Sequence, residues 1–280
     1  MPLIDTVNEE VKKFQGIHLY HGGLSSCAQR VRITLAEKEL EWTAHVIDLR
    51  NNEHCTKEYQ SINPKGLIPT LIHEGRTIIE SVDIIVYLDD HFPYTPLMPQ
   101  SSEGRDQVLA WTEKADRSQN SLKLMSHEFL FKPDRRMSPE ELADFVSNHK
   151  NKNLQEFMRK FSSADGFSQQ EIDDAVQSHY EAFCELDLAL EGHEWLVDDQ
   201  FTLADIAWAP NVHRVDLMLY PLERHPNLYD WYKRLSARPS YRIGLVDHEP
   251  DKAAPAFAAY TKERQAAGTD VRCFGPLNSI

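Results

Sequence analysis

The first hundred residues alternate short apolar runs with segments of helical periodicity. Strands are expected at residues 17–21, 43–49, 67–72 and 76–80, and helices at residues 27–39, 54–61 and 81–91. Glu74-Gly75 separates the last two apolar runs, which is typical of a tight hairpin. The order of elements is therefore βαβα followed by ββα. This order predicts a small α/β domain with helices packed on a mixed sheet.

Strand patterns almost vanish after the proline-rich link at residues 94–100. From about residue 105 to residue 244 the apolar spacing is helical, which predicts a second, all-helical domain. We expect an α/β domain at 15–95, the helical domain at 103–246 and a tail at 247–280. Within the helical domain, residues 132–170 are charged and weakly apolar, so a long mobile excursion is predicted there. The tail is rich in Ala, Pro and Gly and is expected to be irregular.

The charge balance limits the class of partner. The chain has 280 residues, with 30 Lys and Arg against 44 Asp and Glu, and a formal charge of −14. Such an acidic chain is a poor match for nucleic acid or an anionic membrane surface. The N-terminus lacks the pattern of a signal peptide, and no apolar run approaches the ~20 residues of a membrane span. We therefore expect a cytoplasmic protein that binds neither nucleic acid nor membrane.

No metal site is predicted. The four cysteines are scattered, without the close pairs of a zinc site or a disulfide framework: Cys27, Cys55, Cys184 and Cys273. This usage is typical of a reducing compartment. His18 and His21 stand three residues apart on one predicted strand. Their side chains should point to opposite faces of the sheet and should not converge on one ion.

The segment LYHGGLSSCAQRVRI, residues 19–33, contains the most informative candidate chemistry. An apolar strand and a Gly-Gly break lead to Ser25, Ser26 and Cys27 at the start of a helix. Unpaired backbone N–H groups and the positive end of the helix dipole stabilise an anion at such a position, and a thiolate in particular. The alternative is ordinary: serines often cap helices, and a lone cysteine is often a small buried hydrophobe.

Two further positions fit the same ligand. Ile68 precedes Pro69 at the start of a strand, where its backbone N–H and C=O could pair with an extended peptide, especially beside a cis peptide bond. Glu80 and Ser81 stand where a strand passes into a helix, so Ser81 is expected to cap that helix beside outward-facing N–H groups. Each signal alone has a structural alternative. Together they describe a site for an extended, acidic tripeptide that carries a thiol.

The chain resembles the cytosolic glutathione transferases over residues 17–246. SSCAQRVRI is similar to the zeta-class signature, and INPKGLIPTL and IIESVDIIVYL are similar to the two glutathione-binding segments of the superfamily. FTLADIAWAP, residues 201–210, is similar to the capping-box motif of the helical domain, with Thr202 capping and Asp205 reaching back. The resemblance implies a thioredoxin-like domain followed by a helical domain, glutathione as the cosubstrate, Pro69 in the cis form and a homodimer.

The resemblance assigns roles to the three residues at the helix start. Ser25 would donate a hydrogen bond to the glutathione sulfur. Ser26 is the alternative, because theta-like members align their serine one residue nearer the arginine. Cys27 matches the cysteine with which reductive dehalogenase relatives form a mixed disulfide. Which of the three acts on the sulfur stays open at this point.

The resemblance also implies how glutathione is held. The contacts fall on His54, Leu67, Ile68, Pro69, Glu80 and Ser81. The Ile68 backbone would pair with the cysteinyl residue, and Glu80 and Ser81 would hold the γ-glutamyl end. His54 would lie near the glycine carboxylate, with Lys57 and Lys65 as alternatives. Zeta members have glutamine where this chain has Leu67, so one polar contact is missing.

The resemblance leaves several reactions open. The length of the helical segments is similar to bacterial glutathione-dependent enzymes that act on bulky aromatic compounds, including β-aryl etherases and hydroquinone dehalogenases. The expected activity is attack of the glutathione thiolate on an aromatic electrophile. Trp111, Phe129 and Trp208 are candidate acceptor-wall residues, although ordinary core packing is the expected role of at least two of them. The alternatives are redox or dehalogenating chemistry at Cys27, isomerisation of a maleylacetoacetate-type substrate, and a non-catalytic ligand-binding protein.

Overall fold

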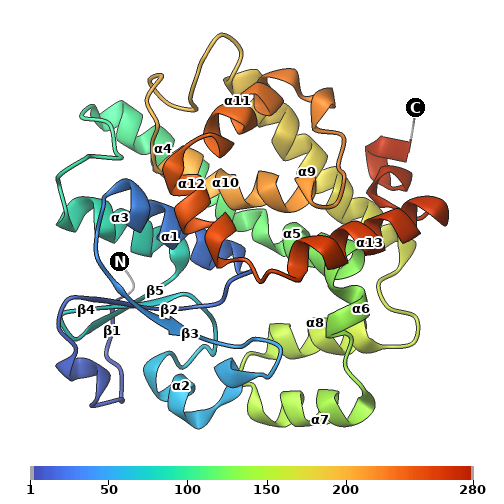
Figure 1. Ribbon diagram of the computed structural model, residues 1–280, viewed down its shortest axis with the longest axis horizontal. Coiled ribbons are helices and arrows are strands. Elements are labelled where there is room, and N and C mark those ends of the chain that lie inside the picture. Colours follow the sequence, from blue (N-terminus) through green and yellow to red (C-terminus); the bar gives the residue numbers. More distant parts are fainter. Residues whose placement is uncertain (1–2, 279–280) are drawn as a thin grey trace.

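The computed structural model describes residues 3–278. Its first part is a five-stranded mixed sheet in the order β1-β5-β4-β2-β3 (Figure 1). The strands are β1 (Leu3–Ile4), β2 (Ile17–His21), β3 (Thr43–Val46), β4 (Thr70–His73) and β5 (Arg76–Ile79). Strands β2 and β3 are parallel, and the other neighbours are antiparallel. The expected mixed sheet is confirmed, and the two-residue β1 adds an edge strand that the sequence analysis did not predict.

Side-chain alternation gives this sheet two covered faces. Leu19 and Leu71 belong to the main core, whereas Ile72 packs with Val11 and Ile62 in a small core of its own. Successive residues of a strand point to opposite faces, so β4 contributes to both cores. The covering helices are α1 (Ser26–Glu37) and α3 (Ser81–His91) on the main-core face and α2 (Lys57–Ile62) on the other.

The two histidines of β2 follow the same alternation. His18 lies on the small-core side, where its Nδ1 is 2.9 Å from His45 Nε2 and its ring stacks on Phe14. His21 faces the helices, and Arg32 Nη1 is 3.1 Å from its Nδ1. The two side chains therefore have separate surroundings on opposite faces of the sheet, as the alternation predicts.

The second part of the chain is helical, as expected, and begins after α3. The helices are α4 (Ser102–Arg117), α5 (Gln119–Ser126), α6 (Lys132–Arg135), α7 (Pro139–Asn148), α8 (Lys152–Ser162), α9 (Gln169–Ala189), α10 (Leu203–Asp216), α11 (Pro226–Ser236), α12 (Pro239–Gly244) and α13 (Ala253–Ala266). A π-helical turn, His127–Phe131, joins α5 to α6. Short 3-10 turns occur at Val11–Lys13, Glu53–Cys55, Leu222–Arg224, Val246–His248, Val271–Cys273 and Gly275–Asn278. Within residues 3–278, no helix combines the length and apolarity needed to cross a bilayer.

Helix α10 forms the centre of the helical part. Its residues from Leu203 to Val215 are all buried, and it packs against α4 and α1. The predicted capping box is present: the Thr202 side chain accepts a hydrogen bond from Ala204 N–H, and Asp205 accepts from the backbone N–H of Thr202 at 2.9 Å. Asp205 also accepts from the Trp231 indole at 2.8 Å. The motif thus fixes both the start of α10 and its contact with α11.

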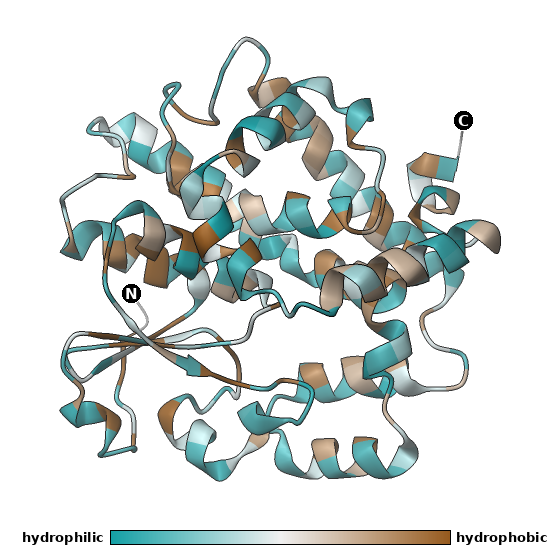
Figure 2. Cartoon of the chain, in the orientation of Figure 1, coloured by the Kyte–Doolittle hydropathy of each residue, from teal (hydrophilic) through white to brown (hydrophobic). Residues whose placement is uncertain are grey.

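Residues 132–170 do not form the predicted mobile excursion. They fold into α6, α7 and α8, of which α7 lies beside α2 (Figure 1). Ser138 and Glu141 form a capping box at the start of α7. Phe145, Met158 and Phe161 are buried, and hydrophobic and hydrophilic residues alternate around both helices (Figure 2). The many charges on the outer sides mask an amphipathic pattern, which explains the wrong prediction.

The tail is also more regular than predicted. Residues Ala253–Ala266 form α13, which runs beside the π-turn of the helical domain. Its composition, rich in alanine, favours helix, because alanine has the highest intrinsic helix propensity. Pro255 stands in the first turn of the helix, where a proline is tolerated because it needs no N–H partner there. The prediction of an irregular tail is therefore wrong, because the helix propensity of the alanines outweighs the prolines and glycines.

Candidate active site

A cavity of about 490 Å³ opens between the α/β domain and the helical domain. All nine residues predicted for catalysis or glutathione binding line it: Ser25, Ser26, Cys27, His54, Leu67, Ile68, Pro69, Glu80 and Ser81. Lys57 and Lys65, the alternatives to His54, are not among the lining residues. Lys65 instead pairs with Glu80 at 2.6 Å. A pocket of this size between two domains is typical of a small-molecule site.

Ser25 occupies the N-cap of α1. Its Oγ accepts a hydrogen bond from Ala28 N–H at 3.3 Å, while the helix itself begins at Ser26. In the described part of the chain the Ser25 hydroxyl donates no hydrogen bond, so its proton is free for a ligand in the cavity. The hydroxyl therefore combines an unused donor with the positive end of a helix dipole.

Ser26 and Cys27 have different surroundings. The Ser26 hydroxyl donates to Gln119 Oε1 at 2.7 Å, and the Cys27 thiol lies 3.9 Å from the same oxygen. Gln119 in turn donates to Asn211 at 2.6 Å, which links the helix start to α10. Burial raises the pKa of Cys27, although nearby Arg30 acts in the opposite direction. The Ser26 hydroxyl proton is thus already donated to Gln119, and the raised pKa of Cys27 favours its neutral thiol form.

Hydrogen bonds from α2 and from the residue after it hold the loop before β4 in place. The Ile68–Pro69 peptide bond is cis, as the resemblance implies. The carbonyl of Leu67 accepts hydrogen bonds from the Tyr59 hydroxyl at 2.6 Å and from Asn63 Nδ2 at 2.9 Å. These two hydrogen bonds fix the chain directly before Ile68, which lines the cavity.

The start of α3 differs from the prediction in one detail. Glu80 is the N-cap residue, with a positive φ of 66°, and no side-chain cap is present; Ser81 is already the first residue of the helix. The Ser81 hydroxyl accepts from the Arg30 guanidinium at 3.3 Å instead of capping. The prediction that Ser81 caps α3 is therefore wrong, because buried Arg30 occupies its oxygen. Both residues still face the cavity at a helix N-terminus.

His54 has an unpaired polar atom. Its side chain is buried, and Nδ1 has no hydrogen-bond partner among the residues that the structure describes. Burial lowers the pKa of His54 to about 4, with smaller effects from His149 and Arg135. The imidazole is therefore neutral near pH 7. A buried polar atom without a partner is costly, so Nδ1 has the character of a ligand contact.

His54, Cys55 and His149 form the one group of possible metal ligands found within residues 3–278, with ligand atoms within 4.8 Å of one another. The group is a poor match for a metal. His149 uses Nε2 on the carbonyl of Gly66 at 3.1 Å and Nδ1 on the N–H of Asn151 at 3.0 Å. Burial raises the pKa of Cys55 to about 12, which disfavours the thiolate that a metal requires.

Two buried arginines of α1 hold the cavity walls together. Arg30 donates to the carbonyls of Ala207 at 2.9 Å and Ala115 at 2.8 Å, and it contacts Asp116 at 3.3 Å. Arg32 donates to the carbonyl of Gly244 at 2.8 Å and to the glycines before α1. No role was predicted for either arginine from the sequence. Their planar guanidinium groups each satisfy several carbonyls at once.

The opposite wall comes from α4 to α8 and α10. Its apolar members are Leu122, Phe131, Met137, Phe145, Leu154 and Met158, and its cationic members include Lys123, Arg135 and Arg214. Trp111, Phe129 and Trp208 do not line the cavity, so none of these candidates forms the acceptor wall, whereas the expectation of core packing for at least two of them is confirmed. Phe129 and Trp208 are core residues, 2% and 1% exposed. Four of the six apolar wall residues lie in 132–170, the segment that the sequence analysis read as an excursion.

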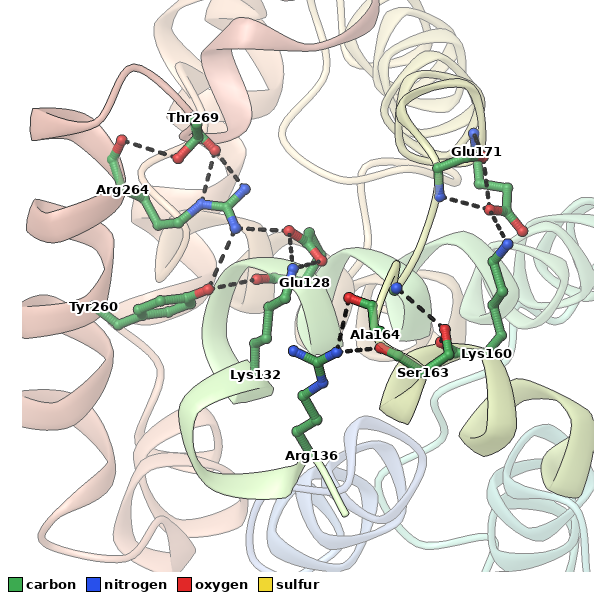
Figure 3. Close-up of polar contacts among 12 residues, drawn as sticks. Glu128, Lys132, Arg136, Lys160, Ser163, Ala164, Glu171, Tyr260, Arg264 and Thr269 are labelled. Carbon is green, nitrogen blue, oxygen red and sulfur yellow. Dashed lines mark hydrogen bonds and ion pairs between the residues drawn. The ribbon is translucent and has the colours of Figure 1, made fainter. Parts of the chain in front are cut away.

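The π-turn of this wall is tied from behind to α13. Glu128 is buried and pairs with Lys132 at 2.8 Å and with Arg264 at 2.6 Å (Figure 3). The Tyr260 hydroxyl donates to the Glu128 carbonyl at 3.3 Å. The same turn places Phe131 in the cavity wall. Local π-helical turns are frequent at functional sites. Helix α13 therefore supports the acceptor side of the cavity.

The comparisons with known proteins agree with this architecture. The family profile described as "Glutathione S-transferase, N-terminal domain" matches residues 24–91, and the C-terminal domain profile matches residues 141–239. The protein LigF of Sphingobium sp. strain SYK-6 is 29% identical over 237 residues, covering 81% of this chain and 91% of LigF. The crystal structure of that β-etherase superposes with a TM-score of 0.75 at 26% identity, covering 82% of this chain and 98% of the other.

Zeta-class relatives match at similar distance. Glutathione S-transferase Z1 of Arabidopsis thaliana is 24% identical, covering 84% of this chain and 94% of the relative. A probable maleylacetoacetate isomerase of Caenorhabditis elegans is 26% identical, covering 83% and 94%. Members of this family use glutathione as cosubstrate. With both domain profiles matched in order, a thioredoxin-like sheet and a helical second domain, the chain belongs to the glutathione S-transferase superfamily.

Proposed function

We propose that this chain is a glutathione transferase in which Ser25 stabilises the glutathione thiolate for attack on an aromatic electrophile. The observation that carries the proposal is the unused proton of the Ser25 hydroxyl at the N-terminus of α1, facing the cavity. Ser26 is the weaker candidate, because its proton is donated to Gln119. This difference in hydrogen bonding supports Ser25 over Ser26 as the residue that acts on the sulfur.

The energy that this role requires is modest. A free thiol has a pKa of about 8.5 and is only a few per cent ionised at neutral pH. Lowering that pKa by about two units makes most of it thiolate and requires about 2.7 kcal/mol of differential stabilisation. One hydrogen bond from a hydroxyl to a thiolate, together with a helix dipole, supplies an amount of this order.

Glutathione would extend along the α/β wall of the cavity. Its γ-glutamyl end would meet Glu80 and the N-terminus of α3 at Ser81, and its cysteinyl backbone would pair with Ile68. The unpartnered Nδ1 of His54 supports a contact with the glycine carboxylate. Since His54 is neutral near pH 7, that contact would be a hydrogen bond without a full positive charge.

The reaction is a substitution at carbon. The glutathione thiol releases its proton to solvent, the thiolate forms a C–S bond to the electrophilic carbon, and the leaving group departs with the electron pair of the bond that breaks. The likeness to a β-etherase supports an aryl ether as substrate, with an aryloxide as leaving group. The apolar and aromatic acceptor wall supports an aromatic substrate.

The decisive measurement is the ionisation of bound glutathione. Ultraviolet absorbance of the thiolate is followed against pH in the binary complex and in free solution. We expect the pKa of the bound thiol to lie about two units below that of free glutathione, and Ser25→Ala to return most of that difference. Ionisation at the same pH in both samples would refute the proposal.

A further inference from the structure

Four cationic side chains on the acceptor side of the cavity have no ion-pair partner within residues 3–278, and one of them, Arg136, donates instead to the carbonyls of Ser163 and Ala164. The other three, Lys123, Arg135 and Arg214, also line the cavity, and none of them forms a salt bridge within residues 3–278. This is unexpected in a chain with a formal charge of −14. Burying unpaired charge is unfavourable, so such a cluster calls for an anion that the protein itself does not supply.

The carboxylates of the cavity are engaged elsewhere. Glu80 pairs with Lys65 at 2.6 Å, and Asp116 contacts Arg30 at 3.3 Å. Asp134 pairs with Arg50 at 2.8 Å. Glu141 completes the capping box of α7 by accepting from the backbone N–H of Ser138 at 2.7 Å. Each acidic residue that lines the cavity thus has a partner other than the three cations.

Arg214 is the best-defined of the three. Its side chain is 3% exposed, and Nη2 donates to the carbonyl of Leu24 at 2.6 Å, directly before Ser25. Its Nε is buried and unpartnered among the described residues. Glu249 is near enough to favour the charged form, but Glu249 is held by His213 at 3.1 Å. Arg214 therefore keeps a free donor beside the site proposed for the sulfur.

Arg135 and Arg214 both lie against the aromatic ring of Phe131. The guanidinium carbon of Arg135 is 4.6 Å from the centroid of the Phe131 ring, and that of Arg214 is 5.2 Å from it. Arg135 forms no hydrogen bond within the described part of the chain. Lys123 stands near His127, whose pKa burial lowers to about 3; all three cations also lower it. His127 is therefore neutral near pH 7 and does not add to the charge.

We propose that the acceptor site selects aromatic electrophiles that carry a carboxylate, which Arg135 and Arg214 bind beside the Phe131 ring. The inference rests on the proposed function and names its substrate class. A carboxylate matches the planar guanidinium donors, and Phe131, Phe145 and Met158 offer an apolar surface for the ring. The competing occupant is the glycine carboxylate of glutathione, because Arg135 also acts on His54.

The test compares two acceptors that differ in one charge: a chloronitrobenzoate and the matched chloronitrobenzamide. In both, the glutathione thiolate attacks the carbon that bears chlorine, and chloride leaves. Each kcat/KM is divided by the uncatalysed rate constant, which removes the intrinsic difference in reactivity. We expect the enzyme to prefer the benzoate at least tenfold. A preference near one, or for the amide, would overturn the inference while leaving the proposed function intact.

Arg135→Gln tests the site itself, because Arg135 makes no hydrogen bond that the fold would lose. We expect its preference for the benzoate to fall at least tenfold, with the KM for glutathione within a factor of two of the parent. The control is Arg242→Gln, which removes an exposed charge that does not line the cavity and should keep the parent preference. A raised KM for glutathione, with both acceptors slowed equally, would assign Arg135 to the glycine carboxylate and overturn the inference.

A binding measurement separates this inference from turnover. With S-methylglutathione occupying the glutathione site, titration calorimetry compares nitrobenzoate with nitrobenzamide. We expect the nitrobenzoate to bind at least tenfold more tightly, and Arg135→Gln to remove most of that difference. Tight binding of the nitrobenzoate in a protein that transfers nothing would refute the proposed function and leave the charged site standing. Equal binding of the two compounds would refute the charged site.

Discussion

The two walls of the cavity are built on different principles. The α/β wall offers small polar groups and backbone at helix N-termini, with Ser25 at α1 and Ser81 at α3. The helical wall offers long side chains, with Arg135 and Arg214 on an aromatic ring. Backbone dipoles are fixed when the domain folds, whereas a long side chain such as that of Arg135, which makes no hydrogen bond among the described residues, keeps conformational freedom that a ligand must restrict. The first wall suits one constant ligand, and the second can change its ligand by changing a few side chains.

Arg30 is the residue on which both walls depend. It reaches Ser81 on the α/β wall and Asp116 on the helical wall, besides two backbone carbonyls. Arg30→Ala removes a fully buried guanidinium together with its several hydrogen bonds, so we expect the free energy of unfolding to fall by about 3 kcal/mol or more. Urea denaturation followed by circular dichroism measures it.

The control for that variant is Arg117→Ala on the same helix as Asp116. Arg117 pairs with Glu113 at the surface, where both side chains are more than 60% exposed. Its loss should change the free energy of unfolding by less than about 0.5 kcal/mol. Equal losses in the two variants would mean that Arg30 does not join the walls in the way that its contacts indicate.

Ser25→Ala tests the α/β wall alone. Removal of the Ser25 hydroxyl should lower kcat about 20-fold for every acceptor, because most of the about 2.7 kcal/mol of thiolate stabilisation is lost while the helix dipole remains. Ser26→Ala is the matched control, because its hydroxyl serves Gln119, and we expect a loss of less than tenfold. Steady-state kinetics with the chloronitrobenzamide measures both. The reverse order of effects would move the catalytic role to Ser26.

The sequence predicts the α/β wall much better than the helical one. Ser25, Ile68 and Ser81 each belong to a short motif whose strand or helix end is visible locally, and all three line the cavity. The contact of Ser26 with Gln119 spans 93 residues, and no local pattern announces it. Met137 and Phe145 were missed for another reason: the capping box at Ser138 was readable, but the surrounding charges concealed the apolar stripe.

Met137→Ala tests the helical wall with an uncharged change. Met137 is partly buried and lines the cavity, so its loss removes apolar surface that an aromatic acceptor would cover. We expect kcat/KM for the neutral acceptor to fall about fivefold, from about 1 kcal/mol of lost burial, with an unchanged KM for glutathione. Leu142 lies in α7 but does not line the cavity, so Leu142→Ala is the control. An equal fall in both variants would point to general loosening of α7.

Substitution of Cys27 should have the smallest effect on kcat. The pH dependence of Cys27 alkylation separates attack by the glutathione thiolate from a mechanism through a mixed disulfide at Cys27. Burial raises the pKa of this thiol, so below the ordinary pKa of a thiol its ionised fraction is smaller than that of a free cysteine. Its alkylation by iodoacetamide should therefore be slow at neutral pH and accelerate only at alkaline pH, well after the exposed Cys184 is labelled. Mass spectrometry of the peptides measures both rates.

Cys27→Ala should keep kcat within about threefold of the parent, since a thiol held in its protonated form is a weak nucleophile. Rapid labelling of Cys27 at neutral pH, together with loss of turnover in the alanine variant, would transfer the chemistry to a mixed disulfide. The reactive sulfur would then be the thiol of Cys27, and the free hydroxyl of Ser25 would no longer account for the activity of the enzyme.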